Sequence, residues 1–211
     1  MLRMKTAIAI AALALSLHAQ AWRDTDASRA EVRTQLETLN ARLLASTSAT
    51  RTLEEWCGEH HMADEAKIVA TRVDGAAKVP SPEQLQRLAV HDASEVRYRR
   101  VQLRCGAHVL SVADNWYVPA RLTPEMNALL DTTQTPFGKA VQSLHPYRTT
   151  IAAKQLWLPS AHRRFRWCRH RTLAIPREVL QHRAVLFTAG HVPFSEVVET
   201  YQGELLKDWR N

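Results

Sequence analysis

The sequence predicts an α+β fold built on an antiparallel sheet, and three observations predict it. Short segments rich in β-branched and aromatic residues recur from residue 68 onwards and end at turn residues. Helical periodicity is found at the start of the chain and in one segment inserted between strands. No repeat, low-complexity linker or second-domain boundary interrupts the chain, and 45% of its 211 residues are hydrophobic, so residues 22–211 are expected to form one domain.

The first expected helix covers residues 28–45. Its apolar residues recur every three or four positions and form one stripe: Val32, Leu36, Leu39 and Leu43. A shorter helix is expected from Thr123 to about Leu130, because Thr123 is a good cap residue and Pro124 suits the first helical position.

The expected strands alternate with turns. They cover residues 68–73, 98–103, 109–118, 172–175, 185–188 and 192–198. The second and third strands predict a hairpin around Gly106, and the third stops at Pro119. Residues 136–138, Pro-Phe-Gly, predict a further turn.

Residues 1–21 have the three parts of a signal peptide. Arg3 and Lys5 precede an apolar run at 7–17 that is too short to span a bilayer, and Ala-Gln-Ala at 19–21 is a small-x-small cleavage pattern. We expect cleavage after Ala21, a periplasmic or secreted protein, and no stable membrane insertion after cleavage. The alternative is a buried N-terminal helix. The mature chain would keep 26 basic and 21 acidic residues, a balance that favours anionic ligands.

Three cysteines, Cys57, Cys105 and Cys168, are too few for a disulfide scaffold. In an oxidising compartment one pair could form a bridge, although the sequence does not identify the pair, or all three could be buried small residues. No CxxC motif supports a zinc or redox site.

Two polar clusters invite a functional interpretation. His60 and His61 stand near acidic residues, but without ligand spacing they favour a solvated turn, and we expect no metal. Residues 162–171 interleave arginines with Phe165 and Trp167, which is typical of nucleic-acid binding, an anion pocket or a basic strand. Export argues against a nucleic-acid partner. The GxSxG and GxGxxG motifs are both absent.

Two charged residues stand within otherwise strand-like segments. Alternation places Arg100 on the same face as Tyr98 and Gln102, and Glu196 interrupts an apolar late strand. The ordinary interpretation of each is a solvated strand face.

Four segments in the same order and spacing resemble the chorismate pyruvate-lyase family, and residues 68–75 are similar to its earlier strand. The four segments are 98–119, 122–141, 165–175 and 192–198. The resemblance implies a six-stranded antiparallel sheet whose helices and loops cover an internal ligand cavity. It also implies elimination of pyruvate from chorismate to give 4-hydroxybenzoate, without a metal or organic cofactor.

The resemblance also implies site residues. The carboxylate-binding arginine of the family falls at Arg100 and its catalytic glutamate at Glu196, and the turn whose backbone amide holds the ligand carboxylate falls at Phe137 and Gly138. A guanidinium binds a carboxylate with two hydrogen bonds. Glu196 would exchange a proton with the substrate or orient its hydroxyl group.

Three hypotheses follow, because chorismate is made in the cytosol and a signal peptide would send this protein away from it. The first is an exported lyase. The second is a binding protein that holds a small aromatic carboxylate in the same cavity without turnover. The third is an envelope protein with a structural or partner-binding role.

Overall fold

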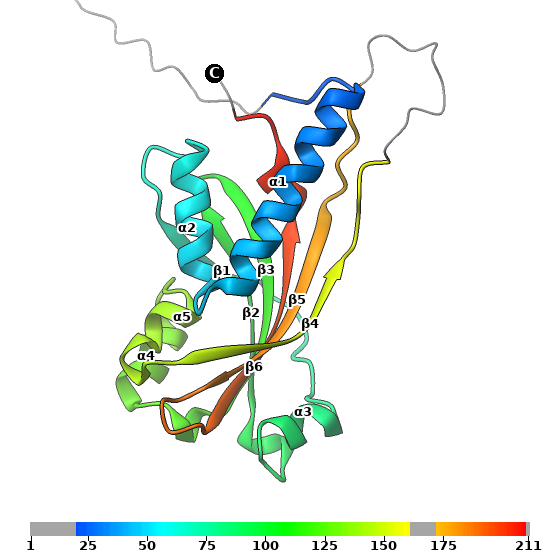
Figure 1. Ribbon diagram of the computed structural model, residues 1–211. Coiled ribbons are helices and arrows are strands. Elements are labelled where there is room, and N and C mark those ends of the chain that lie inside the picture. The colour runs from blue at the N-terminus through cyan, green and yellow to red at the C-terminus, as the bar shows by residue number, and fades with distance from the viewer. Residues whose placement is uncertain (1–19, 161–171, 210–211) are drawn as a thin grey trace, which may run out of the picture.

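The computed structural model describes residues 20–160 and 172–209 (Figure 1). Almost all of the expected signal peptide lies outside these residues, and so do the basic segment 162–171 and Cys168. Within the described part of the chain, one antiparallel sheet of six strands carries helices on its faces. The predicted α+β fold class is therefore confirmed.

The strands follow the order β1-β2-β3-β6-β5-β4 across the sheet, and every neighbouring pair is antiparallel. Their bounds are β1 Ile68–Arg72, β2 Arg97–Cys105, β3 His108–Tyr117, β4 Tyr147–Gln155, β5 Glu178–Phe187 and β6 Pro193–Gln202. The expected hairpin joins β2 to β3, and Gly106 takes the positive φ of +52° that this turn requires.

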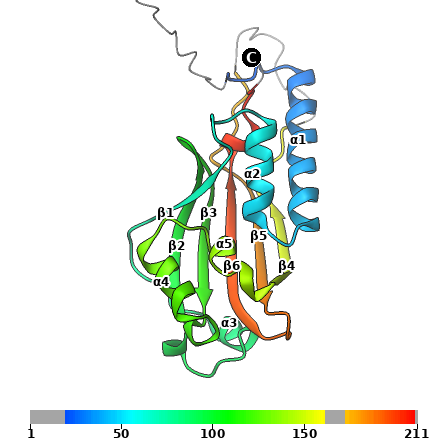
Figure 2. The same ribbon diagram turned by 90° about the vertical axis from the view of Figure 1, so that its left-hand side faces the viewer.

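The helices lie on both faces of this sheet. Their bounds are α1 Asp26–Ala45, α2 Ala49–Glu59, α3 Pro82–Arg87, α4 Pro124–Thr132 and α5 Phe137–Ala140, and a short 3-10 turn, η4, covers Gly203–Leu206. Helices α1 and α2 pack over one face (Figure 2), which we call the front face, and α3 packs against the opposite, rear face through side chains of β6.

The expected apolar stripe anchors α1. Thr25 caps the helix by accepting a hydrogen bond from the Ser28 amide at 3.1 Å. The four residues of the stripe are all completely buried: Val32, Leu36, Leu39 and Leu43. Thr123 caps α4 in the same way, with Pro124 at its first position, so both predicted helices are confirmed.

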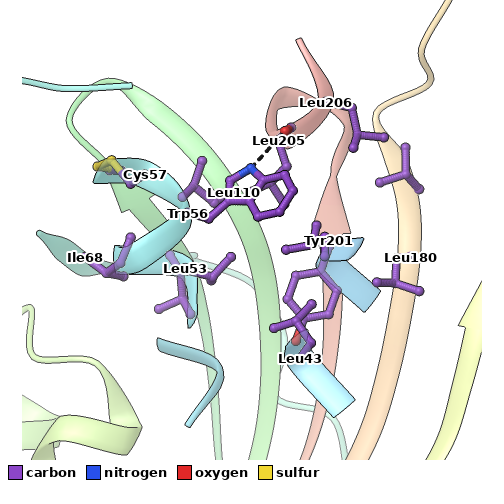
Figure 3. Packing of buried hydrophobic residues seen from close by; sticks show 14 of the residues in the cluster. Leu43, Leu53, Trp56, Cys57, Ile68, Leu110, Leu180, Tyr201, Leu205 and Leu206 are labelled. Atoms are coloured by element: carbon purple, nitrogen blue, oxygen red, sulfur yellow. Dashed lines mark hydrogen bonds between the residues drawn. A yellow bond between two sulfur atoms is a disulfide. The ribbon is translucent and has the colours of Figure 1, made fainter. Parts of the chain in front are cut away.

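A large hydrophobic core fills the space between the front face and α1 and α2 (Figure 3). Trp56 of α2 lies at its centre and donates a hydrogen bond from Nε1 to the Leu205 carbonyl at 3.1 Å. Cys57 of the same helix forms a disulfide with Cys105 at the end of β2. This bond answers the question of cysteine pairing that the sequence left open, and it ties α2 covalently to the sheet.

The structure differs from the sequence expectations in several elements. Residues 137–140 form the short helix α5 where a turn was expected. The segment 172–175 is not a strand, because only Thr172 pairs, in an isolated bridge with Arg23. Strands β5 and β6 are longer than expected, and α2, α3 and β4 were not predicted.

The two ends of the described chain meet beside the core. Gln20 and Asp208 exchange backbone hydrogen bonds of 2.8 and 3.2 Å. The indole Nε1 of Trp22 donates to the Leu206 carbonyl at 2.7 Å, and the Trp22 side chain is only 5% exposed. Across residues 20–160 and 172–209, no helix is both long and apolar enough to cross a membrane.

Candidate functional site

A pocket of about 380 Å³ lies on the front face, between the sheet and helices α2 and α5. Its floor is mostly apolar and is formed by strand residues whose side chains alternate toward this face: Val101, Leu103, Ala113, Leu186 and Val197. The Phe137 ring of α5 also borders the pocket. Volume and lining both suit a small organic molecule.

Arg148, near the start of β4, brings a positive charge to this pocket. Its Nε and Nη2 atoms are buried, and neither donates a hydrogen bond to any described residue. No ion pair of Arg148 is found among these residues either. The guanidinium lies near the Tyr201 hydroxyl, but these two N–H groups have no acceptor in the described part of the chain. Unsatisfied buried donors are costly, so Arg148 offers both of them to an anionic ligand.

Glu199 of β6 brings a buried carboxylate to the same pocket and is only 3% exposed. Its Oε1 accepts a hydrogen bond from the Ser111 hydroxyl at 3.1 Å, and its Oε2 accepts one from the Tyr201 hydroxyl at 3.0 Å. Burial, followed by the Glu199 charge, raises the pKa of Tyr201 well above its ordinary value, so this hydroxyl remains a donor. The nearby Arg148 opposes that rise.

Helix α2 begins at the edge of the pocket. Its cap residue Ser48 accepts a hydrogen bond from the Arg51 amide, and Ser48, Thr50 and Arg51 all line the cavity. A helix N-terminus carries a partial positive charge that favours anions. Gly138 of α5 approaches this turn closely, since a Cβ atom there would lie 3.5 Å from the Thr50 hydroxyl.

Phe137 and Gly138, which the family resemblance assigns to the ligand carboxylate, both line this pocket. Phe137 is held by aromatic neighbours, with ring centroids 5.5 Å from Tyr117 and 6.2 Å from Phe194. The neighbouring Lys139 pairs with Glu54 of α2 at 2.5 Å, which joins the two helices at the pocket.

Arg100 and Glu196, which were expected to converge inside one cavity, do not line this pocket. Both side chains point to the rear face, because Arg100 alternates with the buried Val101, and Glu196 alternates with the floor residue Val197. The Arg100 side chain is 42% exposed and lies 3.6 Å from Asp114.

Glu196 is completely buried in a separate network on the rear face. Arg87 of α3 binds its carboxylate with two hydrogen bonds of 2.7 and 3.0 Å, and Gln84 donates a third of 3.2 Å. Hydrogen bonding to Glu196 raises the pKa of Arg87. The Glu196 carboxylate fastens α3 to the sheet, on the side away from the pocket.

The neighbour of Arg100 is the arginine that turns toward the front face. Arg99 is only 4% exposed, and burial lowers its pKa. Its Nη2 donates to the Thr135 carbonyl at 3.2 Å, whereas its buried Nε and Nη1 donate to no described residue. Arg99 pairs in the sheet with Asn115, which lines the pocket.

Sequence reasoning missed Arg99, Arg148, Glu199 and the two hydroxyls beside Glu199. The available signal was the shared alternation that places Arg99 with Val101 and Glu199 with Val197. The histidine cluster forms the end of α2, where His60 is the C-cap and His61 has a φ of 48°. In residues 20–160 and 172–209, no group of three or more metal-binding side chains comes together.

Comparison with known proteins gives one close relative. The sequence is 43% identical over 196 residues to a protein of Sinorhizobium fredii named "Uncharacterized protein y4mC", covering 89% of this chain and 81% of the relative. No protein-family model matches the sequence.

Solved structures give weaker similarities. The ligand-binding domain of a putative GntR-family transcriptional regulator from Bordetella bronchiseptica has a TM-score of 0.42 at 15% identity, covering 64% of this chain and 82% of that one. The effector domain of PhnF from Mycobacterium smegmatis has a TM-score of 0.48 at 11% identity, covering 75% and 90%.

Proposed function

This chain belongs to the same family as the uncharacterized protein y4mC of Sinorhizobium fredii, and we propose that it binds a small aromatic carboxylate in the front-face pocket. One observation carries the proposal. Arg148 lines the pocket with two buried N–H groups that no described residue accepts from. A carboxylate satisfies both donors at once and neutralises the charge.

The rest of the pocket supports an aromatic ring with a hydroxyl group. The apolar floor and the Phe137 ring would cover the two ring faces, and their burial would supply most of the affinity. Glu199 would accept a hydrogen bond from the hydroxyl of the ligand. The N-terminus of α2 and the cationic Arg51 add a favourable field for an anion.

Calorimetric titration with 4-hydroxybenzoate tests this function. Arg148→Met keeps the aliphatic part of the side chain and removes the donors, and we expect it to weaken binding by about tenfold or more. Arg100→Met is the matched control, because that arginine lies on the rear face, and it should bind as the wild type does. Equal affinity in the wild type and in Arg148→Met would refute the assignment, and so would a loss of binding confined to Arg100→Met.

A second candidate function is the elimination of pyruvate from chorismate. It is favoured by two arginines with unpartnered buried N–H groups, Arg99 and Arg148, and by a buried carboxylate, Glu199. Chorismate carries two carboxylates, which two guanidinium groups could hold. In the reaction a ring C–H proton is removed, the ether C–O bond breaks, and the departing enolpyruvate takes up a proton to become pyruvate while the ring becomes aromatic.

In that reaction Glu199 would exchange a proton with the substrate or orient its ring hydroxyl, with no cofactor. The experiment incubates the purified protein with chorismate and follows 4-hydroxybenzoate and pyruvate by chromatography. We expect turnover to be lost in Glu199→Gln and kept in Glu196→Gln, because Glu196 lies on the rear face. Tight binding of 4-hydroxybenzoate without any turnover of chorismate would refute the lyase activity and support the binding function.

We propose further that residues 1–21 are removed and that the protein acts outside the cytosol. The disulfide between Cys57 and Cys105 supports this, since such bonds persist in oxidising compartments. The buried Trp22 would then be the first residue of the mature chain. Sequencing the N-terminus of protein from the periplasmic or secreted fraction should begin at Trp22, and an intact Met1 in that fraction would refute the cleavage site.

A further inference from the structure

We infer that Ser111 and Tyr201 are positioning residues that make the pocket specific for a ligand that carries a hydrogen-bond donor as well as a carboxylate. The inference rests on the proposed function and adds a cause of selectivity to it. Neither residue lines the pocket, whereas Glu199, to which both donate, does.

The sheet register explains why these three side chains meet. Ser111 of β3 pairs with Tyr201 of β6, and Ala113 pairs with Glu199. Residues two apart on a strand share a face, so all four side chains point to the front face. Ala113 has only a methyl group, which leaves room for a ligand directly beside the Glu199 carboxylate.

Each oxygen of the carboxylate accepts one of the two hydrogen bonds. Oε1 is held by Ser111 at 3.1 Å and Oε2 by Tyr201 at 3.0 Å. An ionised carboxylate has about four acceptor positions and no donor. Each oxygen therefore keeps acceptor capacity for a ligand, and a hydroxyl or amine can use it.

The two donors are themselves fixed by their surroundings. Ser111 and Tyr201 are completely buried, and the Tyr201 ring packs edge-on against His182, with centroids 5.4 Å apart. His182 is held in turn by Asn40 of α1, with 2.8 Å between Nε2 and Oδ1. Because these fixed donors hold the Glu199 carboxylate, it cannot turn away from the pocket when a ligand lacks a donor. Such a ligand therefore leaves acceptor positions of Glu199 unfilled.

Two probes that differ by one hydroxyl group test the inference: 4-hydroxybenzoate and benzoate. Calorimetry gives both dissociation constants for each protein, and their ratio measures the selectivity. We expect the wild type to prefer 4-hydroxybenzoate by about tenfold or more. Tyr201→Phe and Ser111→Ala should each lower this ratio by about threefold or more while leaving the affinity for benzoate nearly unchanged.

Two controls separate positioning from a general loss of structure. Tyr117→Phe removes the hydroxyl of another completely buried tyrosine, which takes no part in the Glu199 network, and should leave the ratio unchanged. Ser111→Thr keeps a hydroxyl group and should keep the ratio of the wild type. A variant that merely loosens the fold weakens binding of both probes alike, so the ratio does not move.

The outcomes distinguish this inference from the proposed function. If both probes bind and the ratio is the same in the wild type, Tyr201→Phe and Ser111→Ala, the positioning role is refuted and carboxylate binding stands. If neither probe binds the wild type at millimolar concentration, the proposed function fails and the inference fails with it. If Tyr201→Phe does not fold, Ser111→Ala decides alone.

Discussion

Reduction of the disulfide between Cys57 and Cys105 should lower the free energy of unfolding by about 4 kcal/mol. The two cysteines are 48 residues apart in the chain, and closing a loop of that length removes this much conformational entropy from the unfolded state. Domains of this kind are stable by only about 5–15 kcal/mol, so the loss is a large fraction of the total. Helix α2 keeps other anchors, including the bond from Trp56 to Leu205, and should remain in place in the reduced protein.

Guanidinium unfolding followed by tryptophan fluorescence, with and without reductant, measures this difference. The double variant Cys57→Ala/Cys105→Ala is the control, because its unfolding curve should not respond to reductant. A change of less than about 1 kcal/mol in the wild type would refute the reasoning, since the loop-entropy argument requires several times that amount.

Three further predictions concern single side chains. Burial lowers the pKa of His182 to about 4. As the pH falls below 6.5, the unfolded chain therefore takes up a proton before the native state does. The free energy of unfolding should fall between pH 6.5 and 4 by up to about 3 kcal/mol. In His182→Gln, unfolding measured across that range should lose this component, and an unchanged profile would contradict it. Gly203→Ala should cost about 2 kcal/mol in chemical denaturation, because a Cβ atom there would lie 2.2 Å from the Pro176 carbonyl oxygen, and wild-type stability would disprove that close contact. Glu196→Gln should also lower the free energy of unfolding by about 2 kcal/mol, because it weakens the bond to Arg87, and should not change the affinity for 4-hydroxybenzoate. Weaker binding by calorimetry would show that Glu196 does contribute to the ligand site.

The fold class could be predicted because it depends on local patterns. The stripe of α1 and the cap at Thr123 are set by residues within a few positions of each other. Helices α2 and α3, which were not predicted, carry local signals as well, because Ser48 and Ser81 cap them and Pro82 stands at the first position of α3. The missed strand lacks such a signal. Strand β4 lies at the edge of the sheet and its side chains are mostly exposed or half-buried, so it carries no apolar alternation.

The position of the site could be predicted only in part. Alternation separates Arg99 from Arg100 correctly, but it does not say which face the pocket lies on. Helices cover parts of both faces here, so Glu196 is buried just as fully as a site residue would be. The spacing of three between Glu196 and Glu199 sends the two carboxylates to opposite faces. Only the three-dimensional packing distinguishes them.

The hydrogen bond from the Trp22 indole to the Leu206 carbonyl brings the expected mature N-terminus beside the end of the described chain. A short flexible linker could therefore join them, and the chain could be opened elsewhere without a change in the path of the sheet. The exposed turn at Gly75, where an added Cβ would meet nothing within 4 Å, offers a place for new ends. Such a circular permutant would place reporter domains far from the native ends and still leave α2 and α5 intact around the pocket.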